Sequence, residues 1–285
     1  MRVVTAVAPF RDELDGARCA GRAVGLVPTM GALHDGHLSL VLRAAGECDV
    51  VAVTVFVNPL QFGPGEDFAA YPRDLDRDVA LAERAGASFV FAPPVEAMYP
   101  EPVVTAVTVG GVSEPLEGAA RPGHFSGVAT VVAKLFAMAG RCRAYFGEKD
   151  FQQLAVVRRM AADLSFPVEV VGCRTVRARD GLALSSRNAY LTPDERAAAP
   201  VLFRGLQAGA AAVLAGETDP AAVRDLVAGV VAAEPLVALE YAEVVDAATF
   251  RTPPELAGEL RLLVAARLGR ARLIDNVGVT APAPA

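Results

Sequence analysis

Two histidines lie three residues apart in a glycine-containing segment near the N-terminus, and their types and spacing suit chemistry on phosphates. The segment reads Pro28-Thr29-Met30-Gly31-Ala32-Leu33-His34-Asp35-Gly36-His37. Glycines let a backbone approach a ligand closely, and the start of a helix presents unpaired N–H groups and a partial positive charge to an anion. Imidazoles there can donate hydrogen bonds to the charge that builds up when a phosphorus atom is attacked. We therefore expect this segment to bind nucleotide phosphates.

The spacing disfavours two common types of nucleotide site. Gly31 and Gly36 begin a G-x-x-x-x-G pattern like that of a P-loop, but His37 and Leu38 follow where that motif requires Lys and Ser or Thr. The first predicted strand is not followed by G-x-G-x-x-G either, so a dinucleotide fold of the dehydrogenase kind loses its main support. What remains is H-x-G-H between a strand and a helix. This pattern is similar to that of nucleotidylyltransferases, in which an oxygen attacks the α-phosphate and pyrophosphate leaves.

Two further clusters carry residues suited to phosphate. Gly147-Glu148-Lys149-Asp150 follows a predicted strand, and Leu184-Ser185-Ser186-Arg187-Asn188 offers two hydroxyls and a permanently charged guanidinium on a loop. Taken alone, the first cluster could be a solvated turn in which Asp150 caps a helix, and the second could be an ordinary interdomain loop. Three such clusters in one chain favour a shared role at a phosphate.

Neutral amides follow two of the predicted strands. Asn58 and Gln61 come just after an apolar strand, and Gln152 and Gln153 open a helix. Amides can hold hydroxyls and carboxylates without adding charge. These side chains are therefore candidates for holding a small acidic substrate.

An acidic run lies at the start of another predicted helix. Asp74, Asp76 and Asp78 are most simply interpreted as the solvated face of that helix start. One of these carboxylates could alternatively reach an Mg²⁺ ion bound to phosphate. No metal ligand is assigned from the sequence.

Short β-branched runs alternate with helical stretches up to about residue 175, which predicts βαβ units. The predicted strands are Ala23–Val27, Val50–Val57, Ser88–Ala92, Ala144–Phe146 and Val168–Cys173, and the predicted helices are His37–Ala45, Asp74–Ala85, Ser126–Ala139 and Gln152–Leu164. Because the strands are apolar throughout, we expect an α/β fold with a doubly wound parallel sheet that is covered on both faces. Ligands are then expected at the carboxyl ends of the strands.

The pattern changes after Asn188 and predicts a smaller α+β domain. Its predicted elements are helices near Pro193–Ala215 and Pro220–Ala233 and strands at Leu239–Val245, Leu260–Ala266 and Arg272–Asp275. The stretch Arg177–Arg187 is expected to be the joining loop, and the Pro/Ala tail at 281–285 is expected to be frayed.

Composition excludes several classes of function. With 53% hydrophobic and 21% charged residues among 285, the chain is expected to be globular. A net charge of −6 opposes binding to nucleic acid. The longest charge-free run, Val50–Gly65, is sixteen residues long and contains two prolines, whereas a membrane span needs about 20 apolar residues. There is no secretory signal pattern, and the four cysteines are scattered, so we expect a cytoplasmic protein with reduced thiols, without nucleic-acid or membrane partners.

Six segments in this order resemble one family, the pantothenate synthetases or pantoate–β-alanine ligases. The segments are Val27–His37, Phe56–Phe62, Tyr71–Arg73, Arg121–Phe125, Phe146–Gln153 and Leu184–Asn188, with fainter similarity at Tyr241–Asp246 and Ile274–Asn276. The motif H-x-G-H alone is shared by many adenylyl- and cytidylyltransferases. The ordered set of segments is far more specific.

The resemblance implies a two-step ligation. Pantoate would attack ATP, accompanied by Mg²⁺, to give pantoyl adenylate and pyrophosphate, and the amine of β-alanine would then displace AMP to give pantothenate. The family folds as a Rossmann-like domain, here 1–176, with a smaller C-terminal lid domain, here 177–285, and is typically a homodimer.

The resemblance also implies roles for individual residues. His37 would be the acid that assists departure of pyrophosphate, with His34 and Lys149 also in catalytic positions, and Gln61 and Gln153 would hold pantoate, with Gln61 near the β-alanine position as well. The implied ATP site comprises Met30, Gly31, Ala32, Leu33, His34, Asp35, Gly36, His37, Gly147, Glu148, Lys149, Asp150, Val176, Leu184, Ser185, Ser186 and Arg187.

Two alternatives remain open at this point. A simple nucleotidylyltransferase acting on a phosphorylated substrate shares the H-x-G-H core, but its acceptor phosphate would need extra cations where this sequence has neutral amides. A non-catalytic nucleotide-binding module would retain the phosphate site without needing His37, Lys149 and a pocket for an acid.

Overall fold

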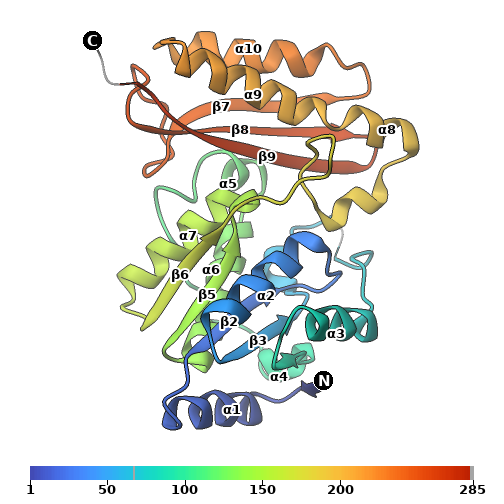
Figure 1. Cartoon of the computed structure of the whole chain (residues 1–285), viewed down its shortest axis with the longest axis vertical. Coiled ribbons are helices and arrows are strands. Elements are labelled where there is room, and N and C mark those ends of the chain that lie inside the picture. The colour runs from blue at the N-terminus through green and yellow to red at the C-terminus, as the bar shows by residue number, and fades with distance from the viewer. Residues whose placement is uncertain (67, 283–285) are drawn as a thin grey trace. The chain divides into compact units, whose positions relative to one another are not determined.

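The structure of the chain is a computed structural model that describes residues 1–66 and 68–282. The chain falls into two units (Figure 1). The first comprises Met1–Glu148 and Gln152–Arg174, and the second comprises Lys149–Phe151 and Thr175–Ala285. The short stretch Lys149–Phe151 therefore belongs with the C-terminal part of the chain, although it begins only two residues after the last residue of a strand of the first unit.

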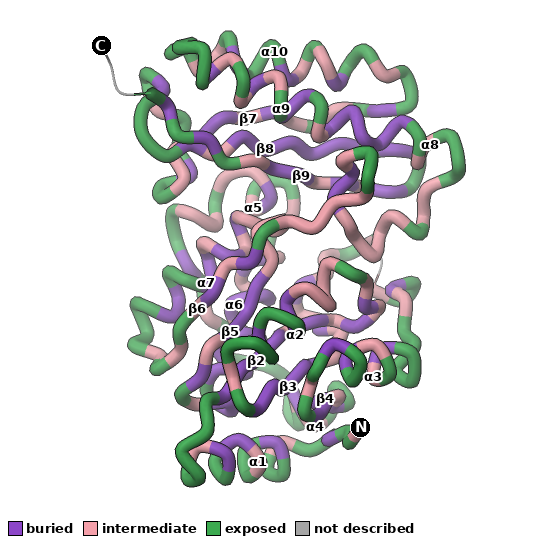
Figure 2. Tube along the Cα trace, viewed as in Figure 1, coloured by how far each residue is buried: buried purple, intermediate pink, exposed green. Residues whose placement is uncertain are grey.

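The first unit contains a six-stranded parallel sheet in the order β1-β4-β3-β2-β5-β6. Its strands are β1 (Arg2–Val4), β2 (Val24–Thr29), β3 (Val50–Val55), β4 (Phe89–Phe91), β5 (Cys142–Gly147) and β6 (Val168–Cys173). The central strands β2 and β3 are almost wholly buried (Figure 2) and consist mostly of β-branched and other apolar residues, as is typical of parallel strands covered on both faces. The predicted α/β fold with a doubly wound parallel sheet is confirmed.

Helices connect these strands. They are α1 (Val7–Cys19), α2 (Asp35–Glu47), α3 (Leu75–Arg84), α4 (Val95–Met98), α5 (Glu117–Ala120), α6 (His124–Ala139) and α7 (Phe151–Asp163), with 3-10 turns η1 (Pro59–Gln61) and η2 (Glu148–Asp150). Helices α2, α3, α6 and α7 lie within two residues of the predicted bounds. The elements β1 and α1 were not predicted, because β1 has only three residues and α1 buries only Phe10, Leu14 and Ala17.

The strand order reverses between β2 and β5, which are neighbours in the sheet. These two strands run parallel, with Gly25 opposite Arg143 and Leu26 opposite Ala144. Their carboxyl ends therefore lie at the same edge, at the topological switch point where open α/β sheets bind ligands. Met30 follows β2 and Gly147 ends β5, so two of the three predicted phosphate clusters begin at this edge.

The second unit contains a three-stranded antiparallel sheet in the order β7-β8-β9. Its elements are η3 (Ser186–Tyr190), α8 (Pro193–Ala198), α9 (Val201–Leu214), α10 (Pro220–Ala232), β7 (Ala238–Asp246), β8 (Glu259–Leu268) and β9 (Ala271–Thr280). Helices α9 and α10 pack on this sheet in a core that includes Leu206, Val227 and Leu262 (Figure 1). The predicted smaller α+β part is confirmed, except that helices α8 and α9 stand where one helix was expected. Pro200 separates them because it has no N–H to continue the helix.

The C-terminal tail differs in part from the expectation. Ala281 is buried, and its N–H donates to the Gly258 carbonyl at 2.9 Å, so the chain is not frayed at this residue. Residues 283–285, on which the rest of that expectation rests, lie outside the described part of the chain.

One helical stretch of the described residues, Pro193–Leu214, is long and apolar enough to cross a membrane by length and composition alone. Half of its most apolar 18-residue segment is buried inside the protein. Its residues Val201, Leu202 and Leu206 lie in the core of the second unit. We therefore interpret it as a core element of that unit.

Candidate active site

Thr29 and Thr54 fix the point at which the chain leaves β2. The Thr29 hydroxyl donates to the Thr54 carbonyl at 2.6 Å and accepts from the Gly31 N–H at 3.1 Å. The Thr29 N–H in turn donates to the Thr54 hydroxyl at 3.2 Å. Gly31 has a φ of +85°, in the left-handed region that favours glycine. The backbone therefore turns directly after the strand, at the switch point of the sheet.

A buried carboxylate from α3 holds the loop after β2. The Asp78 carboxylate accepts from the N–H of Ala32 at 2.8 Å and from that of Leu33 at 2.7 Å. Asp78 is only 1% exposed, and this burial raises its pKa although the two N–H donors oppose the shift. A Cβ at Gly31 would lie 2.8 Å from the Asp78 carboxylate, so only glycine fits. The interpretation of the acidic run as a solvated helix face is wrong for Asp78, which orients the loop.

The two histidines of the H-x-G-H motif lie side by side at the start of α2. His34 is the N-cap residue, and its Nδ1 accepts from the Gly36 N–H at 3.1 Å. A ring nitrogen that accepts carries no proton, so the neutral His34 ring has its proton on Nε2. The rings of His34 and His37 are 4.1 Å apart between centroids, with 38° between their planes. The helix N-terminus and two adjacent imidazoles form an arrangement suited to an anion.

Gln61 lies next to this loop and is held by Asn58. The Gln61 Nε2 lies 2.9 Å from the Met30 sulfur. The Asn58 Nδ2 donates to Gln61 Oε1 at 3.2 Å and to the Gly127 carbonyl at 3.1 Å, and Asn58 Oδ1 accepts from the Tyr99 hydroxyl at 2.9 Å. Asn58 is 1% exposed. It therefore supports Gln61, rather than holding a substrate itself as the sequence suggested.

His124 supports the backbone of Gln61. Its Nε2 lies 3.0 Å from Arg121 Nη1, and its Nδ1 lies 2.9 Å from the Gln61 carbonyl. An arginine can only donate, so Nε2 accepts and the proton on Nδ1 donates to that carbonyl. Burial, together with the charge of Arg121, lowers the pKa of His124 to about 4. Arg121 also pairs with Glu66 through two hydrogen bonds of 2.8 and 2.6 Å, which lower the pKa of that carboxyl.

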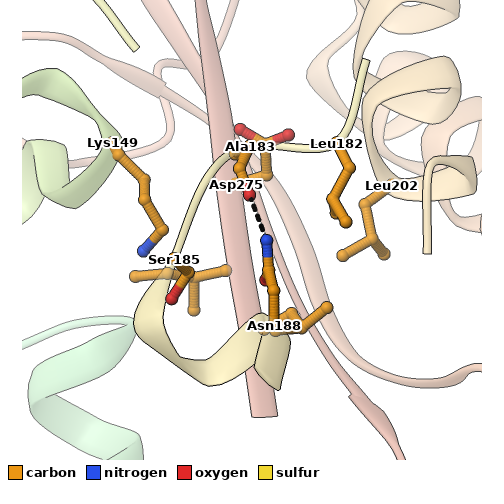
Figure 3. A pocket seen from close by; sticks show the side chains of 9 residues that line it. Lys149, Leu182, Ala183, Ser185, Asn188, Leu202 and Asp275 are labelled. Atoms are coloured by element: carbon orange, nitrogen blue, oxygen red, sulfur yellow. Dashed lines mark hydrogen bonds between the residues drawn. The ribbon is translucent and has the colours of Figure 1, made fainter. Parts of the chain in front are cut away.

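The second unit contains a small pocket at which two of the predicted phosphate clusters meet (Figure 3). The pocket is lined by Lys149, Leu182, Ala183, Ser185, Asn188, Leu202, Leu273, Ile274 and Asp275. The ammonium end of Lys149 points toward Ser185, and Lys149 Nζ lies 3.2 Å from the Asp150 carboxylate. The Asn188 amide donates to the Ala183 carbonyl at 3.1 Å and so holds the loop closed on itself. The lysine and the serine-rich loop are thus neighbours, as a shared role at a phosphate requires.

The loop that carries the serines is anchored at both ends. The Leu184 N–H donates to the Val176 carbonyl at 3.0 Å, and the Ser185 hydroxyl accepts from the Arg187 N–H at 3.3 Å. At the start of the loop, both guanidinium Nη atoms of Arg177 donate to the Asp275 carboxylate, at 2.5 and 2.8 Å. The expected joining loop is therefore an ordered hydrogen-bonded turn.

Comparison with known proteins decides the family. A family model described as pantoate-beta-alanine ligase matches residues 2–278 of the chain. The chain belongs to the pantoate–β-alanine ligase family. It is therefore a ligase that forms a C–N bond in the synthesis of pantothenate.

Curated relatives and solved structures agree with this family. The pantothenate synthetase of Deinococcus radiodurans is 57% identical over 270 residues, which cover 92% of this chain and 96% of the relative. The pantothenate synthetase of Moorella thermoacetica is 50% identical over 277 residues, covering 97% of this chain and 98% of the relative.

Among solved structures, pantothenate synthetase from Thermus thermophilus has a TM-score of 0.93 and 52% identity, covering 98% of this chain and 100% of its own. The pantoate-beta-alanine ligase from Francisella tularensis, complexed with beta-gamma ATP and beta-alanine, has a TM-score of 0.81 and 30% identity. That match covers 97% of each chain.

The two glutamines at the start of α7 have different environments in this ligase. Gln152 is 3% exposed; its Oε1 accepts from the Glu117 N–H at 3.1 Å, and its Nε2 donates to the carbonyls of Val112 and Pro115 at 2.9 and 2.7 Å. Gln152 is therefore a structural residue. Gln153 is half-buried, and its role in holding substrate stays a prediction.

The predicted site residues of the ligase fall into two groups, one in each unit, and their binding roles stay predictions. The first unit brings the loop after β2, the turn η1 and the end of β5 to one edge of its sheet, and the second unit brings Lys149 to the serine-rich loop. In the first unit lie Met30, Gly31, Ala32, Leu33, His34, Asp35, Gly36, His37, Gln61, Gly147, Glu148 and Gln153. In the second lie Lys149, Asp150, Val176, Leu184, Ser185, Ser186 and Arg187.

Replacing the carboxylate beneath the loop should destabilise the protein. In Asp78→Asn one side-chain acceptor becomes an NH₂ group that faces a backbone N–H, so we expect the free energy of unfolding to fall by about 1–3 kcal/mol. Hydrogen exchange at Ala32 and Leu33 should become faster. Denaturant unfolding and exchange measured by mass spectrometry test this. Asp76→Asn, the same change at an exposed residue, is the control; equal stability of the two variants would contradict the role of Asp78.

Acid should weaken the fold through His124. Its pKa of about 4 lies below the ordinary value of 6.5, so between these pH values the folded protein binds fewer protons than the unfolded chain. The free energy of unfolding should therefore fall as pH is lowered, by up to about 2 kcal/mol between pH 7.5 and pH 5. The lowered pKa of Glu66 acts in the same direction at lower pH. Denaturant unfolding of His124→Asn should show a smaller pH dependence in this interval, and an unchanged dependence would exclude His124 as its source.

Proposed function

We propose that the chain makes pantothenate in two steps at the residues described above. A carboxylate oxygen of pantoate attacks the α-phosphorus of ATP, and the bond from that phosphorus to the bridging oxygen breaks. Pyrophosphate leaves and pantoyl adenylate remains. The amine of β-alanine then attacks the acyl carbon of the adenylate, loses a proton, and AMP leaves. The Francisella relative was solved with beta-gamma ATP and beta-alanine, which supports ATP and β-alanine as substrates here.

One observation carries this proposal beyond a generic phosphate site. The neutral amide of Gln61 lies 2.9 Å from Met30, within the loop that leads to the two histidines. A group suited to hold a hydroxy acid thus adjoins the group suited to hold the nucleotide phosphates. An acid bound at Gln61 would have its carboxylate near the α-phosphate, as the first step requires. A nucleotidylyltransferase with a phosphorylated acceptor would need a cation in the place of this amide.

The proposed role of each site residue follows from the chemistry of its side chain. By resemblance to the family, the ATP site would be lined by Met30–His37, Gly147–Asp150, Val176 and Leu184–Arg187. His37 would protonate or hydrogen-bond the departing pyrophosphate, and His34 and Lys149 would stabilise charge on the phosphates. Gln61 and Gln153 would hold pantoate.

We propose that Mg²⁺ enters with ATP. Among residues 1–66 and 68–282 no group of three or more His, Cys, Asp or Glu side chains is placed to hold a metal ion by itself. That fits Mg²⁺, which usually keeps several waters and binds through one or two carboxylates together with substrate phosphates. The carboxylate of Asp150, which is 45% exposed and adjoins Lys149, is a suitable oxygen ligand. Bound there, Mg²⁺ would neutralise phosphate charge.

We also propose a domain division, an oligomeric state and a class of partner for the chain. The division into a Rossmann-like binding domain, 1–176, and a C-terminal lid, 177–285, is supported by the contact units, which change near the same position. A homodimer is supported by resemblance to the family. The net charge of −6 supports an enzyme without nucleic-acid partners.

The products of the purified chain test the proposal. With ATP, Mg²⁺, pantoate and β-alanine, we expect AMP, pyrophosphate and pantothenate in equal amounts. Without β-alanine, labelled pyrophosphate should still exchange into ATP in a pantoate-dependent reaction, because the first step is reversible. Release of ADP and phosphate would exclude an adenylate. Binding of ATP without any turnover would favour the non-catalytic module.

A further inference from the structure

Lys149 is held by the strands of the second unit. It lies between β5 and α7 in the sequence, yet Lys149–Phe151 group with residues 175–285. The Asn276 side chain on β9 donates from Nδ2 to the Lys149 carbonyl at 2.7 Å. Asn276 is 4% exposed, so water does not compete for this bond. The backbone of the lysine is therefore fixed by a residue 127 positions further along the chain.

Arg261 on β8 determines which way the Asn276 amide faces. Arg261 Nε donates to Asn276 Oδ1 at 2.6 Å. Because arginine has no acceptor, the amide oxygen must face Arg261 and the NH₂ group must face Lys149. The guanidinium of Arg261 also lies 3.8 Å from the centre of the Phe151 ring, two residues after the lysine. A Cβ at Gly278 would lie 2.9 Å from Arg261 Nη1, so a small residue there leaves room for the arginine.

The backbone of Asn276 is hydrogen-bonded to the residues that anchor the loop carrying Ser185. The Asn276 N–H donates to the Asp275 carboxylate at 2.7 Å, and its carbonyl accepts from Arg177 Nη2 at 3.2 Å. Arg177 forms the ion pair with Asp275 at the start of that loop. Asn276 thus connects the backbone of Lys149 and the anchor of the Ser185 loop. The two phosphate clusters of the second unit share one support.

We propose that Asn276 and Arg261 are positioning residues of the ligase, which set Lys149 for the adenylation step. They do not touch the reacting atoms. Asn276 fixes the main chain of Lys149 through one hydrogen bond, and Arg261 keeps the amide in the orientation that makes this bond. This inference rests on the proposed role of Lys149 at the ATP phosphates.

The expected effect of losing this support is on rate rather than on binding of pantoate. In Asn276→Ala the Lys149 carbonyl loses its partner, and a small displacement of the ammonium is enough to weaken a transition-state contact. We expect the kcat of pantoate-dependent pyrophosphate exchange to fall roughly 10-fold or more, with the KM for pantoate within about 2-fold of the wild type. Arg261→Gln should give a smaller loss of the same kind, because the Asn276 amide oxygen then loses the arginine donor that orients it.

A double-mutant cycle separates a positioning role from general damage. If Asn276 acts through Lys149, then adding Asn276→Ala to Lys149→Ala should cause little further loss of exchange, whereas two independent defects would multiply. Thr280→Val, an exposed change on the same strand, is the matched control, and it should leave the rate unchanged. Thermal unfolding of each variant shows whether it is folded. If Asn276→Ala does not fold, the test is made with Arg261→Gln instead.

The outcomes distinguish the two proposals. Multiplicative losses in the double variant, or normal kcat in both Asn276→Ala and Arg261→Gln, would overturn the positioning role while leaving the ligase mechanism intact. Full activity of Lys149→Ala would instead remove the role of Lys149 on which the inference depends.

Discussion

Lys149→Ala is expected to slow pantoate-dependent pyrophosphate exchange by at least about 100-fold, the size of loss seen when one charge contact to a transition state is removed. Lys149 is 20% exposed and lines the pocket with Ser185, and in the proposed mechanism its positive charge contacts phosphate oxygens. The Asp150 carboxylate lies 3.2 Å from Lys149 Nζ and partly offsets the positive charge of the lysine. A cation that arrives with ATP would pair with this carboxylate and leave the lysine charge to the phosphates. The exchange rate at saturating ATP and pantoate measures the effect.

The control for this variant removes a charge from the helix that follows. Arg159 on α7 is 64% exposed and pairs with Asp163 only one turn away. Arg159→Ala should therefore keep the exchange rate within about 2-fold, because exposed pairs contribute little. Lys149→Arg tests geometry, since it keeps the charge but presents it on a planar guanidinium. A near-normal rate in Lys149→Ala would remove the lysine from the mechanism.

The fold was predictable because its strands are strongly patterned. The central strands β2 and β3 are apolar runs rich in β-branched residues, and burial on both faces requires such runs. Strand β1 is only three residues long, and pairing with β4 rather than its own sequence makes it a strand. Helix α1 could have been found from the spacing of Phe10, Leu14 and Ala17, which share one face.

The site was predictable where it depends on local sequence and not where it depends on distant residues. The H-x-G-H segment lies at a strand end and a helix start, as its glycines and histidines indicate. Asp78 supports it from 46 residues away, which no local motif reports. A signal did exist, because Asp78 precedes the buried residues Ala82 and Ala85 by four and seven positions, on one helix face.

The two glutamines at the start of α7 also show that local sequence does not predict contacts with distant residues. Both Gln152 and Gln153 follow a strand end, so residue type and position alone do not separate them, and only the resemblance to the family favours Gln153. The structure separates them because Gln152 lies on the buried face of α7 with Val156 and is used by three backbone groups. Asn58 was likewise ranked with Gln61, although its hydrogen bonds are all internal. Residue type at a strand end therefore identifies the region of a site, but hydrogen-bond partners decide which side chains remain available to a substrate.

His37→Ala should likewise lower the rate of adenylation by at least about 100-fold. His37 lies in the first turn of α2, against the His34 ring, where an imidazole can donate to pyrophosphate as it leaves. The loss should appear in kcat, with a smaller change in the KM for pantoate, because the contact strengthens only as charge develops. Leu42→Ala, an exposed change on the same helix, is the control and should keep normal kinetics. A variant that binds pantoate poorly but turns over normally at saturation would show that His37 holds substrate instead. Near-normal kcat and KM would leave His34 and Lys149 as the groups that stabilise the transition state.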